Sequence, residues 1–518
     1  MIKASLVNLF SAKTDRHDGK FAIALSLIFF VVALVGVLNH EMWSDELMFW
    51  MMARDNHSLG DLIRTLRFEY MHPWLWGILL YGISRFTREP LAMQVLHVAI
   101  ATAAVFLLVR FAPFTRLQKV LLSFGYFFLY EYSVISRNYG LGVLVIFGFC
   151  VLFPRRRQSY LPLAGVLAVM VNVNFYSRMT AIALVAMLLL ELWRDSTLAK
   201  QAFRRKGDLV ASGLIVMAGL LLSIVQNIPP DLSGGSLGLL SNGLTLKQVA
   251  SAIANLWRAY FPLPGLSLRF WNSNILDDGT AALLSWIPLG FSIALFRSRP
   301  LILFLYLFNL AEVLLFHTLW TGLMRHLGLI FILFIVCLWL SKEYPAEPML
   351  ERSWLRLPRF FDRYQAQFLS VVLVVQVVAG VYAYTMDLVN PFSAAKDVAQ
   401  LIRSQLRSQP GEPRLVAGAI DVFTQSVSGY LDQPIFYPER DRLGTYISSD
   451  NRALRPTGQD LVAIVTKTPG GDNSLLVLNK PLDPVPKIPN WSLTEIAQFH
   501  RAIVRVENYT LYSLRRNP

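Results

Sequence analysis

Long apolar runs alternate with short basic segments along the first 390 or so residues of the chain. A helix needs roughly 20 apolar residues to cross the hydrocarbon core of a bilayer. By this criterion the pattern predicts eleven membrane-spanning helices. They are expected at 21–39, 91–110, 118–133, 138–153, 160–174, 178–193, 209–227, 280–296, 300–317, 325–341 and 366–387.

One further apolar stretch, 73–86, is too short to be counted among them. Its fourteen residues would rise only about 21 Å as a helix, less than the hydrocarbon thickness. We expect a non-spanning helix on the outer membrane surface. With this choice every basic cluster falls on one side of the membrane, as the positive-inside tendency requires. These clusters are the N-terminus, 110–119, 155–157, 194–206, 297–299 and 342–363.

From residue 388 onward the pattern changes. A polar helix is predicted at 393–406, and short β-like runs occur at 415–417, 461–465 and 475–478 between Gly, Pro and Asp clusters. A segment of about 130 residues is long enough to form its own core. The predicted fold is therefore an all-α polytopic membrane domain over 1–387, with outer loops at 40–90 and 228–279, followed by a small extracytoplasmic α/β domain over 388–518.

Composition agrees with a membrane protein: 54% of residues are hydrophobic, 16% are charged, and mean hydropathy is +0.46. The net charge of +14 would suggest nucleic acid in a soluble chain, but here the basic residues set orientation, so we expect no nucleic-acid partner. Cys150 and Cys337 both lie in apolar runs, which argues against a disulfide framework or a cysteine metal site. No small-residue cleavage site follows the first apolar run, and we expect a retained anchor.

The first outer loop carries the main candidate chemistry. Ser44 is predicted to cap a helix that has Asp45 and Glu46 in its first turn, where carboxylates complement the helix dipole. A second, amphipathic helix is predicted to begin at Ser58 and to lie on the membrane. In the other outer loop, 228–279, a helix is predicted from the spacing of apolar residues over 246–257, and it would either gate the lipid donor or simply act as an interfacial anchor.

Several other polar side chains stand at the outer ends of the predicted spans. Such groups are costly at a membrane edge unless they are paired or functional. Each taken singly could be a snorkelling or capping residue, but all of them are expected on the same face as Asp45. They are His72, Glu131, Arg137, Tyr139, Asn172, Asn174, Arg178, His317, Arg325 and His326.

Four short motifs in this order resemble a known superfamily: Ser44-Asp45-Glu46, His72-Pro73-Trp74-Leu75, Ser136-Arg137-Asn138-Tyr139-Gly140-Leu141 and Met324-Arg325-His326-Leu327-Gly328. Over roughly 20–390 the chain resembles the GT-C superfamily of polyprenyl-phosphate-sugar-dependent glycosyltransferases, near the protein O-mannosyltransferase and lipid A aminoarabinose transferase branch. It departs from that family in having a single proline after His72, where two are common. It also has Asn172 and Asn174 where relatives often have a histidine.

The resemblance implies an inverting glycosyltransferase that moves a sugar from a polyprenyl-phosphate carrier to an acceptor hydroxyl. A phosphate monoester has a second pKa near ~6 and leaves without a strong acid, so one carboxylate base suffices. The family assigns this base to Asp45, with Glu46 orienting the acceptor or binding metal.

For the donor phosphate the candidates are Arg325 with His326 first, Arg137 with Tyr139 second, and Arg178 third. His72, Glu131, Asn174 and His317 are expected to contact substrate. No cofactor is required. A divalent cation, if one binds, would use Asp45 and Glu46, although two adjacent carboxylates make a poor cage.

Two other functions stay open at this point. A polysaccharide polymerase or ligase using diphosphate-linked glycans would also need outward arginines, but the acidic first loop argues against it. A lipid or sugar transporter would place ionisable groups near mid-membrane and often shows repeated halves, which are absent from the sequence.

We expect a bacterial inner-membrane protein with its N-terminus in the cytoplasm and its active site and C-terminal domain in the periplasm. Its partners would be the lipid-linked donor, an acceptor of unknown identity and membrane lipids.

Overall fold

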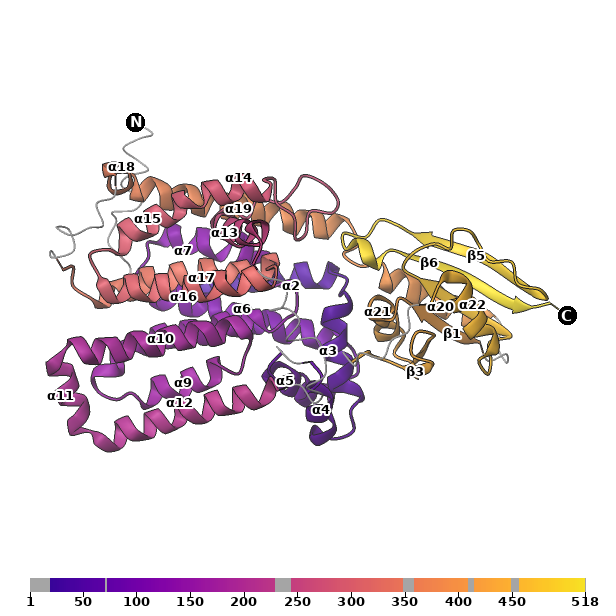
Figure 1. The fold of residues 1–518 in the computed structure, drawn as a ribbon, viewed down its shortest axis with the longest axis horizontal. Helices are drawn as coiled ribbons and strands as arrows, with labels where there is room; N and C mark the ends of the chain where they lie inside the picture. Colours follow the sequence, from indigo (N-terminus) through magenta and orange to yellow (C-terminus); the bar gives the residue numbers. More distant parts are fainter. Residues whose placement is uncertain are drawn as a thin grey trace.

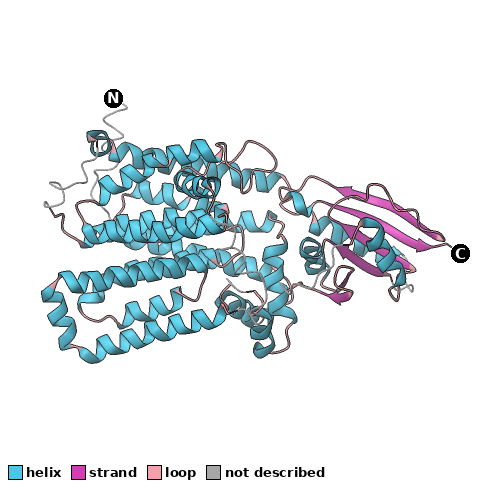
Figure 2. Cartoon of the chain, viewed as in Figure 1, coloured by secondary structure: helices cyan, strands magenta, loops and turns pink. Residues whose placement is uncertain are grey.

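The computed structural model describes residues 19–69, 72–228, 244–347, 358–408, 414–448 and 456–517. A helical bundle occupies the chain up to Val389, and a domain built around one β-sheet follows it (Figures 1 and 2). The molecule is elongated, with the bundle at one end and the sheet domain at the other (Figure 1). The basic N-terminal residues before Gly19, much of the loop predicted at 228–279, and Arg352 and Arg356 lie outside the described residues.

Among the described residues, nine helical segments are long and apolar enough to cross a membrane. The chain is thus an integral membrane protein. These segments are α2 (Gly19–Asn39), α6 (Leu91–Phe111), α8 (Tyr139–Leu152) with η2 (Phe153–Arg157), α10 (Phe175–Arg194), α12 (Lys206–Gln226), α14 (Asp278–Leu284) with α15 (Trp286–Phe296), α16 (Pro300–Leu319), α17 (Met324–Leu340) with η4 (Ser341–Glu343), and α19 (Gln365–Val389).

Two of the eleven predicted spans are shorter than expected. The stretch 118–133 is broken into α7 (Arg116–Ser123) and one π-helical turn, η1 (Phe127–Glu131). Gly125 stands at the break, and glycine is a poor residue for a helix interior. The stretch 160–174 forms only α9 (Leu161–Met170), because Asn174 already caps the next helix. The apolar stretch 73–86 is a ten-residue helix, α5 (Leu75–Ser84), in agreement with the short helix predicted.

The first outer loop folds into α3 (Ser44–Asp55), α4 (Leu59–Leu66) and α5, which lie beside one another at the end of the bundle that faces the sheet domain (Figure 1). Ser58 caps α4 as predicted, since its side chain accepts a hydrogen bond from the Asp61 N–H. The predicted cap of α3 was wrong. Trp43 occupies the cap position and Ser44 is the first helical residue.

The sheet domain contains six strands in the order β3-β2-β1-β4-β6-β5. β1 pairs in parallel with β2 and β4, whereas the other neighbours are antiparallel. Helices α20 and α21 pack against each other, and α21 also contacts α3. The elements are α20 (Ala395–Ser408), β1 (Leu415–Ala419), α21 (Asp421–Leu431), β2 (Ile435–Tyr437), β3 (Arg442–Gly444), α22 (Gly458–Lys467), β4 (Asn473–Leu478), β5 (Trp491–Phe499), η6 (Arg505–Glu507) and β6 (Tyr509–Arg516).

The predicted helix at 393–406 and strands at 415–417 and 475–478 are therefore confirmed. The β-like run at 461–465 was a wrong assignment, because it lies inside α22. Thr457 and Asp460 form a capping box that begins this helix, and the buried side chains Val462 and Val465 are three residues apart on one helical face. A short apolar run does not by itself distinguish a strand from a buried helix.

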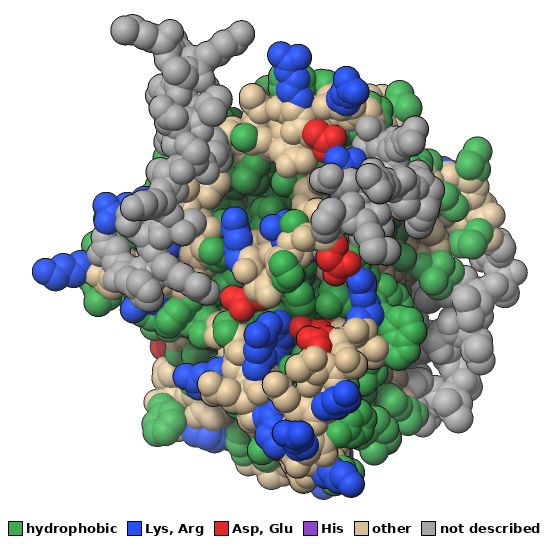
Figure 3. All heavy atoms as spheres, turned by 90° about the vertical axis from the view of Figure 1, so that its left-hand side faces the viewer, with side chains coloured by type: hydrophobic (Ala, Val, Ile, Leu, Met, Phe, Trp, Pro, Cys, Tyr) green, Lys and Arg blue, Asp and Glu red, His purple; other side chains and the backbone are tan. Residues whose placement is uncertain are grey.

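Basic residues are frequent at the end of the bundle away from the sheet domain, where Lys and Arg side chains are spread over the visible face and Asp and Glu are fewer (Figure 3). The helix ends there are the last turns of α6 and α10, the segment η2, and the short helices α11 (Ser196–Arg204) and α18 (Arg359–Arg363). The sheet domain and helices α3 to α5 lie at the opposite end (Figure 1). The two ends of the bundle thus differ strongly in charge.

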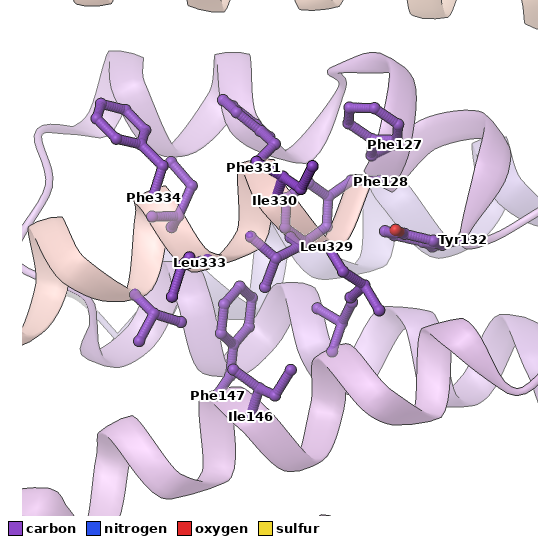
Figure 4. Close-up of a cluster of buried hydrophobic side chains, with 14 of the residues drawn as sticks. Phe127, Phe128, Tyr132, Ile146, Phe147, Leu329, Ile330, Phe331, Leu333 and Phe334 are labelled. Carbon is purple, nitrogen blue, oxygen red and sulfur yellow. The ribbon is translucent and has the colours of Figure 1, made fainter. Parts of the chain in front are cut away.

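Helix α17 runs through the core of the bundle, and almost all of its side chains are buried. Phe331 packs between Phe127 of η1 and Phe334, while Phe147 of α8 lies on the other side of the cluster (Figure 4). Because α17 is fixed along its length, the residues of its first turn, Arg325 and His326, are held in place by the core.

Helix α19 passes close to the break between α7 and η1, and we expect this contact to tolerate no added methyl group. A Cβ at Gly380 would come within 2.9 Å of the Tyr126 main-chain nitrogen, whereas a Cβ at Gly148 would meet nothing within 4 Å. Gly380→Ala should therefore destabilise the fold by about 1–3 kcal/mol. Gly148→Ala, the matched control, should leave stability unchanged or raise it because alanine favours helix. Thermal unfolding of both purified variants in detergent checks this, and equal melting temperatures would contradict it.

Candidate active site

The centre of the site is the carboxylate of Asp45, in the first turn of α3. Its Oδ2 lies 3.0 Å from Arg137 Nη1 and 3.1 Å from Arg325 Nη2. The three side chains come from α3, from the turn before α8 and from the first turn of α17, so segments far apart in the sequence meet here. Burial raises the pKa of Asp45, but the charges of the two arginines outweigh it and hold the pKa below its usual value. Asp45 is thus ionised at neutral pH.

Arg137 also fixes His72. Its Nη1 donates to the main-chain oxygen of Asp45 at 2.8 Å, and its Nη2 lies 3.2 Å from His72 Nε2. A guanidinium only donates, so Nε2 is the acceptor and the ring is neutral. Burial and the charge of Arg137 lower the pKa of His72 to about 3, which agrees with a neutral ring.

Arg325 has unused hydrogen-bonding capacity. Only 7% of the residue is exposed, and its Nε and Nη1 have no hydrogen-bond partner among the described residues. Its guanidinium lies over the rings of Trp43 and Trp271, at 5.5 and 5.8 Å from their centroids. Buried donors are normally satisfied. A guanidinium with two open N–H positions is suited to an anion with several oxygen atoms, such as a phosphate.

These groups open into a cavity of about 350 Å³. Six of the predicted site residues line it: Asp45, His72, Tyr139, Asn174, Arg325 and His326. The sequence reading missed Phe68, Glu69, Phe175, Phe316 and Trp320, and did not assign roles to Asn138 and Tyr176. Glu69 is a buried acid three residues before His72. This short distance from His72 in the sequence was the signal that could have identified Glu69 as a site residue. The aromatic residues gave none, because aromatics are common at every membrane interface.

Both ring nitrogens and one face of the His326 ring contact neighbouring residues. Its Nδ1 accepts from the Leu323 N–H at 2.9 Å and its Nε2 lies 2.8 Å from the Tyr139 hydroxyl, so Nε2 carries the proton. The ring stacks on Tyr176 with centroids 5.0 Å apart. His326 therefore presents its ring to the cavity while its nitrogens hold neighbouring elements together.

Glu46 points away from this cavity. Its carboxylate accepts from the Ser136 N–H at 2.5 Å and lies 3.0 Å from His40 Nε2. His40 Nδ1 is 2.8 Å from Asp387, at the end of α19. Burial lowers the pKa of His40, but the carboxylates of Asp387 and Glu46 outweigh it and raise the pKa to about 10. A charged imidazole thus joins α3 to α19.

Arg137 contacts Asp45 and His72 but is not itself a lining residue, and four more predicted residues do not line the cavity either. Glu131 is buried and accepts from Tyr126 Oη and Trp271 Nε1, both at 3.3 Å. His317 contacts Tyr176 Oη at 2.9 Å and Asn255 at 3.1 Å, which places it behind the cavity wall.

Arg178 and Asn172 complete this group. Arg178 donates to the Val171 carbonyl at 3.5 Å, and its guanidinium lies over the Phe175 ring, 5.5 Å from the centroid. Asn172 joins α9 to α12 by donating to Ala168 and Gly219 and accepting from Gln226. Asn174 does line the cavity, but its side chain also caps α10 by accepting from the Ser177 N–H.

A shared cation site at Asp45 and Glu46 is not formed by this arrangement, because the two carboxylates face different partners. Among the described residues no group of three or more His, Cys, Asp or Glu side chains could hold a metal ion.

The sheet domain caps the helix that carries Asp45. Glu507 of η6 is fully buried and accepts from the Ser44 N–H at 2.6 Å and from Ser393 Oγ at 2.5 Å. The hydroxyl of Tyr430 accepts from the Met42 N–H at 2.7 Å. Trp43 offers no side-chain oxygen for the first turn of α3. A carboxylate from the other end of the chain supplies it and complements the helix dipole.

Taken together, the fold and the site define an integral membrane protein with an arginine-lined cavity at the end of its bundle that adjoins a C-terminal sheet domain. No protein-family model and no curated protein matches the chain. Solved structures similar to it include two of one protein. ArnT from Cupriavidus metallidurans bound to undecaprenyl phosphate is 12% identical, with a TM-score of 0.49 over 96% of this chain and 98% of that one. The same protein in the apo state is 12% identical, with a TM-score of 0.49 over 95% and 97%.

The cap at Glu507 predicts a specific pH dependence. Burial raises the pKa of Glu507 from 4.5 to about 7, although the hydrogen bonds from Ser393 and Ser44 act to lower it. Between these values the folded chain keeps a proton that the unfolded chain has lost, so stability falls as pH rises from 4.5 to 7. In the wild type this loss of unfolding free energy amounts to about 3 kcal/mol. Glu507→Gln keeps an acceptor for the Ser44 N–H but cannot ionise, so the variant should not show the loss.

The melting temperatures of wild type and Glu507→Gln, measured in detergent from pH 4.5 to 8, should therefore diverge as pH rises, with the variant the more stable at pH 8. Glu507→Ala, which lacks the acceptor, should be less stable than Glu507→Gln at every pH. Parallel curves for wild type and Glu507→Gln would contradict the assignment.

Proposed function

We propose that the chain is an inverting glycosyltransferase that moves one sugar from a polyprenyl-phosphate carrier to an acceptor hydroxyl. The observation that carries the proposal is the meeting of Asp45, Arg137 and Arg325 at a cavity of about 350 Å³. Two arginines that share one carboxylate leave a positive charge for the donor phosphate. The open Nε and Nη1 of Arg325 would receive its oxygen atoms.

In the transfer step the acceptor oxygen attacks the anomeric carbon from the face opposite the phosphate. The bond between the anomeric carbon and the phosphate oxygen breaks, and its electron pair leaves with the polyprenyl phosphate. The acceptor proton passes to Asp45. Because a single displacement occurs, the configuration at the anomeric carbon is inverted. His72, held neutral by Arg137, faces the same cavity and can orient the sugar or the acceptor.

The ion pairs of Asp45 would couple donor binding to catalysis. Without donor, both arginines contact Asp45 and lower its pKa, which makes it a weak base. A donor phosphate competes for the same N–H groups. Once it binds, the negative charge near Asp45 rises and its proton affinity with it. Asp45 would thus become an effective base only when donor is present.

The charge of the two ends of the bundle supports an orientation with the cavity outside. The basic helix ends would face the cytoplasm by the positive-inside tendency, and the cavity and the sheet domain would face the periplasm of a bacterial inner membrane (Figure 3). A cavity of about 350 Å³ suits one sugar with its phosphate better than the growing glycan of a polymerase. Its place at one end of the bundle is unlike the mid-membrane site of a transporter.

Replacing Asp45 with asparagine removes the base but keeps the shape of the side chain. We expect Asp45→Asn to reduce transfer about 10²- to 10⁴-fold while binding of undecaprenyl phosphate is kept or tightened, because both arginines are freed. Radiolabelled transfer from a panel of polyprenyl-phosphate sugars to a bacterial envelope extract, in proteoliposomes, measures the first quantity. Native mass spectrometry measures the second. Full transfer by this variant would remove Asp45 from the mechanism.

Arg325 is expected to contribute to donor binding through charged hydrogen bonds. Arg325→Gln should weaken undecaprenyl phosphate binding about 10- to 100-fold, as the loss of 1.5–3 kcal/mol implies. Arg178→Gln is the matched control, since Arg178 lies at the same end of the bundle but does not line the cavity. If both variants bind the carrier like wild type and melt like wild type, the phosphate site is elsewhere.

A further inference from the structure

A second cavity, of about 700 Å³, lies between the sheet domain and the loop that joins α13 (Leu246–Tyr260) to α14. Arg269 of this loop, Lys480 and Arg505 of η6 line it, and its lining contains no Asp or Glu. We call these three residues and the cavity between them the basic groove. It shares no lining residue with the cavity at Asp45.

The cations of the basic groove differ from Arg88 and Arg64, two other exposed arginines on this side of the molecule. Arg88 pairs with Asp432 and Asp55, and Arg64 pairs with Asp61. By contrast, Arg269, Lys480 and Arg505 form no ion pair with any residue that the structure describes. Three positive charges around one cavity repel one another within the Debye length. An anion in the groove would relieve that repulsion.

A residue with a buried, unused hydroxyl also belongs to the wall of the groove. Thr510 is fully buried, lines the cavity, and its Oγ1 has no hydrogen-bond partner in the described part of the chain. A hydroxyl can donate to a phosphate oxygen, and buried hydroxyls are normally satisfied. The groove therefore combines positive charge with an unused donor, which is the chemistry that recognises a phosphate.

The position of the groove indicates where such a phosphate comes from. The loop from α13 leads directly into α14, the start of a candidate membrane span at Asp278. Leu266, three residues before Arg269, is 84% exposed. An exposed leucine beside an arginine is typical of the membrane interface. In Figure 1 this loop stands at the end of the bundle that faces the sheet domain.

We propose that the basic groove binds the headgroup phosphate of an anionic phospholipid of the outer leaflet. Arg269 and Arg505 contact the phosphate from opposite walls, Lys480 adds charge, and Thr510 donates its hydroxyl. The lipid chains extend along the membrane beside the α13–α14 loop. This site is separate from the proposed transfer reaction and does not depend on it.

The test is a titration of delipidated, full-length protein with phosphatidylglycerol, followed by native mass spectrometry. The triple variant Arg269→Gln/Lys480→Gln/Arg505→Gln should bind this lipid on the order of 100-fold more weakly, since each cation near a headgroup contributes about fivefold. The control variant Lys467→Gln/Lys487→Gln/Arg501→Gln removes the same charge from exposed positions outside the groove and should bind like wild type. Arg269→Gln alone should lose about fivefold, so the proposal stays testable if the triple variant folds poorly.

Further measurements in the same titration distinguish the source of the phosphate. Wild type should bind phosphatidylglycerol more tightly than phosphatidylcholine, and excess inorganic phosphate should not displace it. Equal binding of the two phospholipids would overturn the proposal, as would equal losses in the groove and control variants. Displacement by inorganic phosphate would mark a site for a free anion. Stronger binding of undecaprenyl phosphate at this groove would mark a second carrier site. Either of these two results would also overturn the headgroup assignment.

Discussion

The ion pair of Asp45 with Arg137 and Arg325 is the contact on which the arrangement of the site depends. Buried charges are tolerated only when they are paired, and here one carboxylate serves two guanidinium groups. The pairing brings α3, the turn before α8 and the start of α17 together. Because one negative charge faces two positive ones, the contact is electrostatically incomplete and leaves room for an anion. The same feature that holds three segments together thus makes the cavity suited to a phosphate.

Three consecutive residues of α3 attach the helix to three different parts of the molecule. The Ser44 N–H donates to Glu507 of the sheet domain, Asp45 pairs with the arginines at the cavity, and Glu46 contacts His40 beside α19. Successive residues on a helix point about 100° apart, so one turn can reach all three. The position of the Asp45 carboxylate is therefore fixed from opposite sides by the bundle and by the C-terminal domain.

Hydropathy and motif order predicted the membrane class, the short helix at 73–86 and six of the residues that line the cavity, because these depend on local composition. Composition and motif order did not predict the break at Gly125, the helix at 458–467 or the contact of the Ser44 N–H with Glu507. The first depends on α19 packing against Tyr126, and the last on Glu507, which lies 463 residues away. Glu131 and His317 show a further limit of reading positions along a span. They lie near the right membrane depth, but their side chains turn into the core, which position along a span does not reveal.

The short segment η6 connects the two sites of the molecule. Arg505 at its start lines the basic groove, and Glu507 at its end caps α3. Because η6 is a single short turn, Arg505 stands only two residues from the carboxylate that caps α3. The basic groove and the first turn of α3, which carries Asp45, therefore share one three-residue support from the C-terminal domain.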